Sequence, residues 1–128
     1  MKRLLSIVIL AATTIIAWAD PTISFVEKSH DFGNINEADG PVTYTFRFTN
    51  DGDKPLVIIS AKSECGCTKP KYPMQPIAPG SDSAVSVTFD PVGYAGEFMK
   101  DIKVRTNDKK HRTVRLRITG VVIPERPL

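Results

Sequence analysis

The feature that most constrains this chain is a period-two alternation of apolar and polar residues in short segments. Over residues 42–49, Val, Tyr and Phe alternate with Thr and Arg. The same alternation recurs in three further segments, residues 85–90, 102–105 and 114–119. Because successive side chains of a strand point to opposite faces, each segment predicts a half-buried β-strand. Residues 56–59 predict a more fully buried strand, and residues 22–26 a short leading strand.

Residues typical of turns separate these segments. Asn, Asp, Gly and Pro gather at four places, residues 50–53, 78–80, 90–93 and 107–110. About seven short strands with frequent turns in about 100 residues predict an all-β fold, an immunoglobulin-like antiparallel β-sandwich. No cysteine pair spans distant strands, and the only tryptophan, Trp18, precedes the predicted domain. We therefore expect a core of aliphatic and phenylalanine side chains.

The first 19 residues predict a signal peptide. Two basic residues precede an apolar or small stretch over residues 4–17, and a small-x-small exit follows at residues 17–19. We expect cleavage after Ala19, which leaves residues 20–128 as one immunoglobulin-like domain, periplasmic or secreted. The apolar stretch is shorter than the roughly 20 residues of a membrane-spanning helix, so we expect no stable membrane span after cleavage.

The charge of the mature chain argues against one class of partner. Removal of Lys2 and Arg3 from the 17 basic residues leaves 15, against 14 acidic residues. Nucleic-acid-binding domains carry a strong basic excess, so a net charge near +1 predicts no nucleic-acid partner.

Seven short motifs occur along the mature chain. They are Asp31-Phe32-Gly33-x-Ile35, Phe46-x-Phe48-x-Asn50-x-Gly52-x-x-Pro55-Leu56, Cys65-Gly66-Cys67-Thr68, Ile77-x-Pro79-Gly80, Val87-x-Phe89-Asp90, Gly96-x-Phe98-x-Lys100-x-Ile102-x-Val104-x-Thr106-Asn107 and Leu116-x-Ile118-x-Gly120. In this order they resemble the secreted domain of unknown function 1573 family, whose members are similar to immunoglobulin-like and PapD-like sandwiches. The resemblance implies a fold and an exported location, and it implies no activity.

Cys65 and Cys67 are the only cysteines and the first candidates for chemistry. Thiols this close tend to pair in an oxidising compartment. A disulfide needs Cα atoms within about 4.4–6.8 Å, so the chain must turn, and we expect Gly66 to allow this through a positive φ. Because the closed loop is so small, the bond would contribute near the low end of about 0–5 kcal/mol.

Three roles stay open for these cysteines. The first is a structural clip or a pair of half-buried thiols. The second is a redox role, in which lysines would lower the thiol pKa and Glu64 would oppose them; the lysines are Lys62, Lys69 and Lys71. The third is binding of a soft metal such as Cu(I), with further ligands brought in by the fold from Met74, His30 or His111.

Hydrolytic catalysis has little support in the sequence. The chain has two histidines and lacks the Gly-x-Ser-x-Gly and His-Glu-x-x-His motifs. His30 and Asp31 are adjacent, so on a strand they would point to opposite faces. Asp51 and Asp53 flank Gly52 in an ordinary turn, too short for a calcium loop. We therefore expect no enzymatic activity and no cofactor.

A basic surface is the last candidate site. If the last two predicted strands are neighbours, Lys103 and Arg105 lie beside Arg115 and Arg117 on the exposed face. This is either a solvated face with counter-charges such as Asp101 or a docking surface for an acidic protein, glycan or phosphorylated envelope lipid.

Together these observations predict an exported binding or scaffolding module of the cell envelope, whose partner is a protein or an envelope glycan. The alternative is a periplasmic thiol redox or copper-binding protein that uses Cys65 and Cys67. The sequence does not set the oligomeric state.

Overall fold

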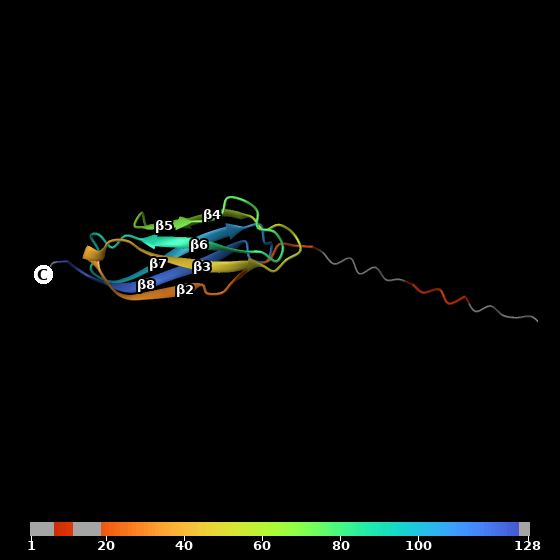
Figure 1. Ribbon diagram of the computed structural model, residues 1–128, viewed down its shortest axis with the longest axis horizontal. Helices are drawn as coiled ribbons and strands as arrows, with labels where there is room; N and C mark the ends of the chain where they lie inside the picture. Colours follow the sequence, from red (N-terminus) through yellow and green to blue (C-terminus); the bar gives the residue numbers. More distant parts are fainter. Residues whose placement is uncertain (1–6, 12–18, 126–128) are drawn as a thin grey trace, which may run out of the picture.

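The computed structural model describes residues 7–11 and 19–125 and is a two-layer β-sandwich (Figure 1). Its eight strands are β1 (Ile23–Phe25), β2 (Ser29–Asn36), β3 (Val42–Asn50), β4 (Ile58–Ser63), β5 (Thr68–Lys71), β6 (Asp82–Phe89), β7 (Gly96–Thr106) and β8 (Thr113–Ile123). A 3₁₀ helix, Glu37–Asp39, follows β2. Most of the predicted signal peptide lies outside the described residues. Within the described ranges, no helix has the length and apolar character needed to span a membrane.

The strands form two four-stranded sheets, in the orders β1-β3-β6-β5 and β2-β8-β7-β4. The predicted all-β, immunoglobulin-like sandwich is therefore confirmed. The four segments with period-two alternation lie in β3, β6, β7 and β8, and residues 22–26 contain β1. The prediction of a more fully buried strand over residues 56–59 is wrong, because Leu56 and Ile58 are buried but Ile59 is exposed. β4 begins at Ile58, and Leu56 makes an isolated bridge with Ile77.

The sequence prediction missed β2 and β5, and both lie at sheet edges. The alternation is interrupted in β2, where the register shifts between Asp31 and Asn34 around Gly33, a glycine at φ 68°. Only four residues form β5, and one of them is Pro70. A proline cannot donate a backbone hydrogen bond, so it is tolerated at an edge but weakens any strand prediction.

One pairing departs from the predicted antiparallel arrangement, because β2 runs parallel to β8. All other strand pairs are antiparallel. The leading segment starts beside β3 as β1 and crosses to the other sheet over residues 26–28, where it continues as β2. One continuous segment therefore supplies an edge strand to each of the two sheets.

The core fills the space between the two sheets. Alternate residues of β3, β6, β7 and β8 point inward, as period-two spacing requires. Its largest fully buried apolar side chains are Phe46, Phe48, Leu56, Val85, Val87, Phe89, Ile102, Val104, Leu116, Ile118 and Val122. The expected aliphatic and phenylalanine core is therefore observed.

Asn50, at the end of β3, is fully buried and hydrogen-bonded on all sides. Its side-chain oxygen accepts from the N–H groups of Thr22 (3.2 Å) and Gly52 (3.0 Å). Its amide nitrogen donates to the carbonyls of Lys54 (2.8 Å) and Ile77 (3.0 Å). A buried amide with all these partners fixes the loops around it, because any displacement leaves a polar group unpaired.

Asp108, in the loop between β7 and β8, is 2% exposed. Its carboxylate accepts from the N–H groups of Ile23 (3.1 Å) and Lys110 (2.9 Å) and contacts His111 Nδ1 at 2.9 Å. Burial by itself would raise the pKa of Asp108. The hydrogen bonds from Ile23, His111 and Lys110 outweigh it and hold that pKa below the ordinary value.

We predict that Asp108→Ala lowers the free energy of unfolding by about 3 kcal/mol, because the buried N–H of Ile23 loses its acceptor. Since the folded-state pKa is depressed, the carboxylate stabilises the fold above about pH 4, and this contribution is lost as pH falls further. Urea denaturation at several pH values measures both effects.

The control for this variant is Asp51→Ala, which removes an exposed carboxylate from a nearby turn and should change stability by less than about 0.5 kcal/mol. An Asp108→Ala protein that is as stable as wild type, with an unchanged acid transition, would contradict the anchoring role.

Candidate functional site

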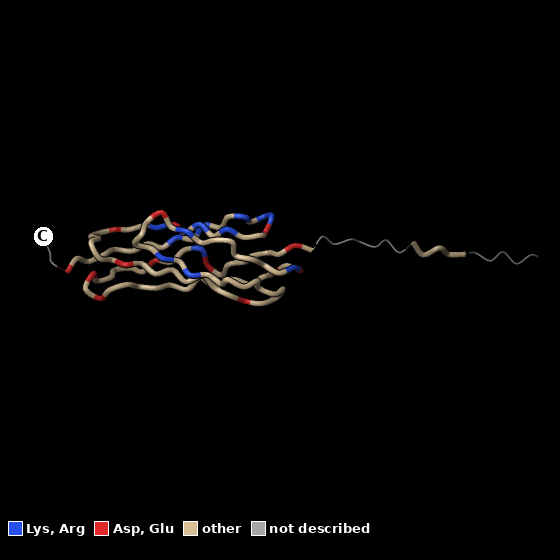
Figure 2. Tube along the Cα trace, turned by 90° about the horizontal axis from the view of Figure 1, so that it is seen from above, with Lys and Arg blue, Asp and Glu red and all other residues tan. Residues whose placement is uncertain are grey.

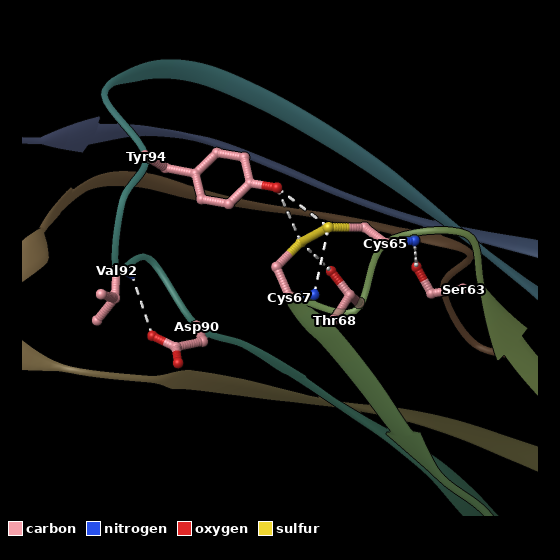
Figure 3. Close-up of a disulfide and its surroundings, with 7 residues drawn as sticks. All are labelled: Ser63, Cys65, Cys67, Thr68, Asp90, Val92 and Tyr94. Atoms are coloured by element: carbon pink, nitrogen blue, oxygen red, sulfur yellow. Dashed lines mark hydrogen bonds between the residues drawn. A yellow bond between two sulfur atoms is a disulfide. The ribbon is translucent and has the colours of Figure 1, made fainter.

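Cys65 and Cys67 lie in the turn between β4 and β5 and are joined by a disulfide (Figure 3). The Thr68 N–H donates to the Cys65 carbonyl at 3.1 Å, and the two Cα atoms are 5.2 Å apart. The expected positive φ at Gly66 is wrong, since the glycines in that conformation lie elsewhere in the chain. A turn with ordinary φ values already brings the cysteines close enough, so this glycine is not required for its backbone freedom.

Hydrogen-bond donors converge on the two sulfurs. The Tyr94 hydroxyl lies 3.1 Å from Cys65 Sγ and 3.3 Å from Cys67 Sγ, and Figure 3 shows its ring pointing at the bond between them. The Thr68 hydroxyl is 3.4 Å from Cys67 Sγ, and the Cys67 N–H donates to Cys65 Sγ at 3.2 Å. A disulfide sulfur carries no hydrogen, so both hydroxyls are the donors.

Aromatic packing holds Tyr94 in place from the core side. Its ring meets the edge of Phe89 at 5.5 Å between centroids, and Phe89 stacks on Phe98 at 4.1 Å. Phe98 faces Gly120 across the β7–β8 pair, where an added Cβ would lie 2.6 Å from the Phe98 ring. The Lys100 ammonium covers the Tyr94 ring at 5.0 Å from its centroid.

A groove of about 570 Å³ opens beside the disulfide on the β4–β7–β8 surface. Residues from β4, β7, β8 and the cysteine turn line it: Lys62, Ser63, Glu64, Cys65, Met99, Lys100, Asp101, Lys103 and Arg115. Four of these side chains are basic and two are acidic. The groove is therefore electropositive, and the disulfide is at its edge.

Three of the basic residues form a line across adjacent strands, which we call the basic row: Lys62, Lys103 and Arg115. Lys103 is the register partner of Lys62 on one side and of Arg115 on the other, and all three are exposed. In Figure 2, Lys and Arg positions gather toward one side of the sandwich, whereas Asp and Glu positions are scattered. Lys62 was missed as a member of this surface because only the β4–β7 pairing places it there.

The two strands predicted to carry the basic surface are neighbours, as expected, because β7 pairs with β8. Arg105 is exposed two residues beyond Lys103, whereas Arg117 pairs with Asp101 through contacts of 2.7 and 3.1 Å. The hydrogen bond from Arg117 is the main reason that the pKa of Asp101 lies below its ordinary value. Arg115 is 3.9 Å from the same carboxylate. Asp101 is thus the counter-charge of Arg117, and the net positive charge resides on the basic row and Arg105.

Two of the three candidate metal ligands outside the cysteine turn have other contacts, and the third is exposed. His30 stacks on Tyr44 at 3.7 Å between ring centroids, His111 contacts Asp108, and Met74 is exposed in the connection from β5 to β6. In the described part of the chain, no group of three or more His, Cys, Asp or Glu side chains is arranged to hold a metal ion. The carboxylate of Asp31, the residue next to His30, accepts a hydrogen bond from the Gly33 N–H at 2.8 Å.

Comparison with known proteins gives a family and a fold. The sequence model of the family described as "Protein of unknown function (DUF1573)" matches residues 23–122. No curated protein matches the chain.

Solved structures share the sandwich. A protein of unknown function from Porphyromonas gingivalis W83 is 18% identical with a TM-score of 0.71, over 86% of this chain and 51% of its own. PapD-like domain 7 of human CEP192 is 16% identical with a TM-score of 0.66, over 84% and 89%. The periplasmic chaperone SfaE is 12% identical with a TM-score of 0.58, over 83% and 61%. This chain thus spans about half of the first of these proteins.

We predict that replacing both cysteines, as C65S/C67S, lowers the free energy of unfolding by only about 1–2 kcal/mol. The loop that the disulfide closes contains one residue between the cysteines, so the bond removes little entropy from the unfolded chain. Urea denaturation measures the change. The matched control is wild-type protein denatured and alkylated without reductant, which should take up no alkyl group. A loss above about 4 kcal/mol would mean that the disulfide holds much more than its own turn.

Proposed function

This chain belongs to the DUF1573 family of proteins of unknown function, and we propose that it is an exported binding module for an acidic segment of a partner protein. The segment docks in the electropositive groove on the outer surface of β4, β7 and β8. The observation that carries the proposal is the basic row, which brings Lys62, Lys103 and Arg115 into register on three adjacent strands.

Unpaired charge is the first support for an acidic partner. Within the described residues, Lys62 and Lys103 make no salt bridge, and the nearest carboxylate contact of Arg115 is long at 3.9 Å. Adjacent strands lie about 4.8 Å apart, so three cations are concentrated across about 10 Å of surface. Like charges this close repel one another, and a bound carboxylate group relieves that repulsion.

The spacing along the strand favours an extended peptide. Lys103, which lines the groove, and Arg105, which lies just beyond it, point to the same face of β7 two positions apart, or about 6.7 Å. An extended peptide with an acidic residue at every second position repeats at the same distance. The fold likeness to a periplasmic chaperone is consistent with a protein partner, and we choose an acidic polypeptide over an acidic glycan for this reason.

Export is the second part of the proposal. Among residues 7–11 and 19–125, the first backbone hydrogen bond is at Asp20, whose carbonyl accepts the Asp53 N–H at 3.0 Å. Thr22 and Ile23 then bind Asn50 and Asp108. Cleavage after Ala19 would therefore leave every one of these anchoring contacts within the mature protein, in the periplasm or beyond.

The alternative function, soft-metal binding by Cys65 and Cys67, has less support. Both sulfurs would first have to be released from the disulfide, and a Cu(I) site would then need a ligand beyond the two thiolates or a two-coordinate geometry. His30 stacks on Tyr44 and His111 contacts Asp108, whereas Met74 is exposed in the connection from β5 to β6.

We predict that the triple charge reversal K62E/K103E/R115E weakens binding of a short peptide of alternating Glu and Ser by about tenfold or more. This corresponds to about 1.4 kcal/mol, because three attractive charge contacts become repulsive. Fluorescence anisotropy with a labelled peptide measures the affinity, which for wild type should also fall as ionic strength rises.

The matched control is K54E/K69E/K71E, which makes the same change in net charge at exposed lysines outside the groove. It should bind as wild type does. If both triple variants lose affinity equally, net charge and not the groove governs binding. If an acidic polysaccharide binds and the peptide does not, the choice of a protein partner is wrong.

We predict that protein expressed with its leader in a Gram-negative host is recovered from the periplasm with the mass of residues 20–128. Replacement of Val8 and Leu10 by Arg interrupts the apolar stretch and should block processing. Intact mass of the periplasmic and cytoplasmic fractions gives the result. Unprocessed wild-type chain in the membrane fraction would contradict cleavage after Ala19.

A further inference from the structure

We propose that the Cys65–Cys67 disulfide exchanges with a thiol carried by the acidic segment that docks in the groove. Cys65 Sγ is the atom attacked, and Cys67 is the leaving thiolate. The substrate class is a cysteine flanked by acidic residues in a polypeptide. This inference rests on the proposed function for its substrate, whereas the chemistry of the sulfurs stands on separate observations.

The two cysteines differ in their place at the groove. Both cysteines are half-buried, but Cys65 lines the groove and Cys67 does not. The basic row and Lys100 line the same groove, so a segment held by its carboxylates lies next to Cys65. Positive charge around the groove also favours the thiolate form of an incoming cysteine, which is the nucleophile in exchange.

The leaving group has donors already in place. A thiolate on Cys67 would accept from the Tyr94 hydroxyl, now 3.3 Å away, and from the Thr68 hydroxyl, now 3.4 Å away. The Lys100 ammonium on the Tyr94 ring adds positive charge on that side. A leaving thiol of lower pKa departs faster. The Thr68 hydroxyl, whose sulfur contact is Cys67 Sγ, and the Tyr94 hydroxyl, which lies 3.1 Å from Cys65 Sγ and 3.3 Å from Cys67 Sγ, therefore accelerate the bond breaking.

The exchange takes place in two steps, in which atoms and electrons balance. In the first, the partner thiolate forms a bond to Cys65 Sγ, the Cys65–Cys67 bond breaks, and its electron pair leaves on Cys67, which takes a proton from solvent. In the second, another thiol of the partner attacks the mixed disulfide and releases Cys65. The partner ends as an intramolecular disulfide, and the domain ends with two thiols. The domain is reduced and the partner oxidised, with no other oxidant.

The fold can survive this cycle because the disulfide closes a loop with a single intervening residue. The turn keeps its backbone hydrogen bonds from Thr68 to Cys65 and from Asp90 to Cys67, at 3.1 and 2.8 Å. Tyr94 remains held by Phe89 whether or not the sulfurs are joined. The reduced turn is therefore kept near the groove, where the reverse reaction can regenerate the disulfide.

The test measures opening of the disulfide in the intact mature protein by short peptides that contain two cysteines. The acidic peptide alternates Glu with Ser, with two Ser positions replaced by Cys, and the neutral peptide has Gln for Glu. Samples are acid-quenched, alkylated and weighed by mass spectrometry, which separates unreacted protein, mixed disulfide and dithiol. We expect the acidic peptide to react about tenfold or more faster, an advantage that K62E/K103E/R115E removes.

Two variants test the sulfur chemistry apart from docking. Tyr94→Phe keeps the ring and removes only the donor, so it should slow opening about tenfold while the cysteine-free acidic peptide binds as before. Tyr72→Phe makes the same chemical change at a half-buried tyrosine outside the groove lining and should react as wild type does. Fragmentation of the trapped adduct should place the peptide on Cys65 and the alkyl group on Cys67.

The outcomes separate this inference from the proposed function. If the cysteine-free acidic peptide binds in the groove but the acidic dithiol reacts no faster than the neutral one, exchange is wrong and docking stands. An adduct on Cys67, or an unchanged rate in Tyr94→Phe, also overturns the assignment. If the acidic peptide neither binds nor reacts faster, while both dithiols open the disulfide equally, the proposed partner and the substrate class fail together.

Discussion

Two buried polar side chains at one end of the sandwich hold the N-terminal segment between the sheets. Asn50, at the end of β3, accepts the Thr22 N–H, and Asp108, in the loop after β7, accepts the next N–H, that of Ile23. The N–H groups of two consecutive residues are thus bound by side chains that belong to different sheets. Leaving either polar group unpaired in the core would be costly, so the two contacts act together. The path of the chain from β1 into β2, which supplies an edge strand to each sheet, depends on them.

The candidate site lies along β7, where its two neighbours supply different parts of it. Pairing with β4 and β8 lines up the basic row, because register on a sheet determines which side chains share a face. On the inner face, Phe98 packs over Gly120 and against Phe89, which in turn supports Tyr94 beneath the disulfide. The core packing of β7 therefore positions a donor at the sulfurs, while its outer face carries charge to the same groove.

The strands with clear alternation could be predicted from the sequence, since half-buried strands show period-two spacing whatever their neighbours are. β2 and β5 could not, because a register shift around Gly33 breaks the pattern in the first and Pro70 lies in the second. The buried roles of Asn50 and Asp108 were equally hidden. Both occur in segments whose composition is that of an ordinary exposed turn, and their burial depends on partners far along the chain.

The sequence by itself determined that the chain is a β-sandwich with an aliphatic and phenylalanine core, and that Cys65 and Cys67 are its only thiol pair, because these follow from local spacing and composition. The tertiary structure decided the parallel course of β2, the place of Lys62 in the basic row, the pairing of Arg117 with Asp101, and the approach of Tyr94 to the sulfurs. Each of these joins residues that are distant in the chain. Contacts of that kind depend on which strands become neighbours and in which register, and no local pattern carries that information.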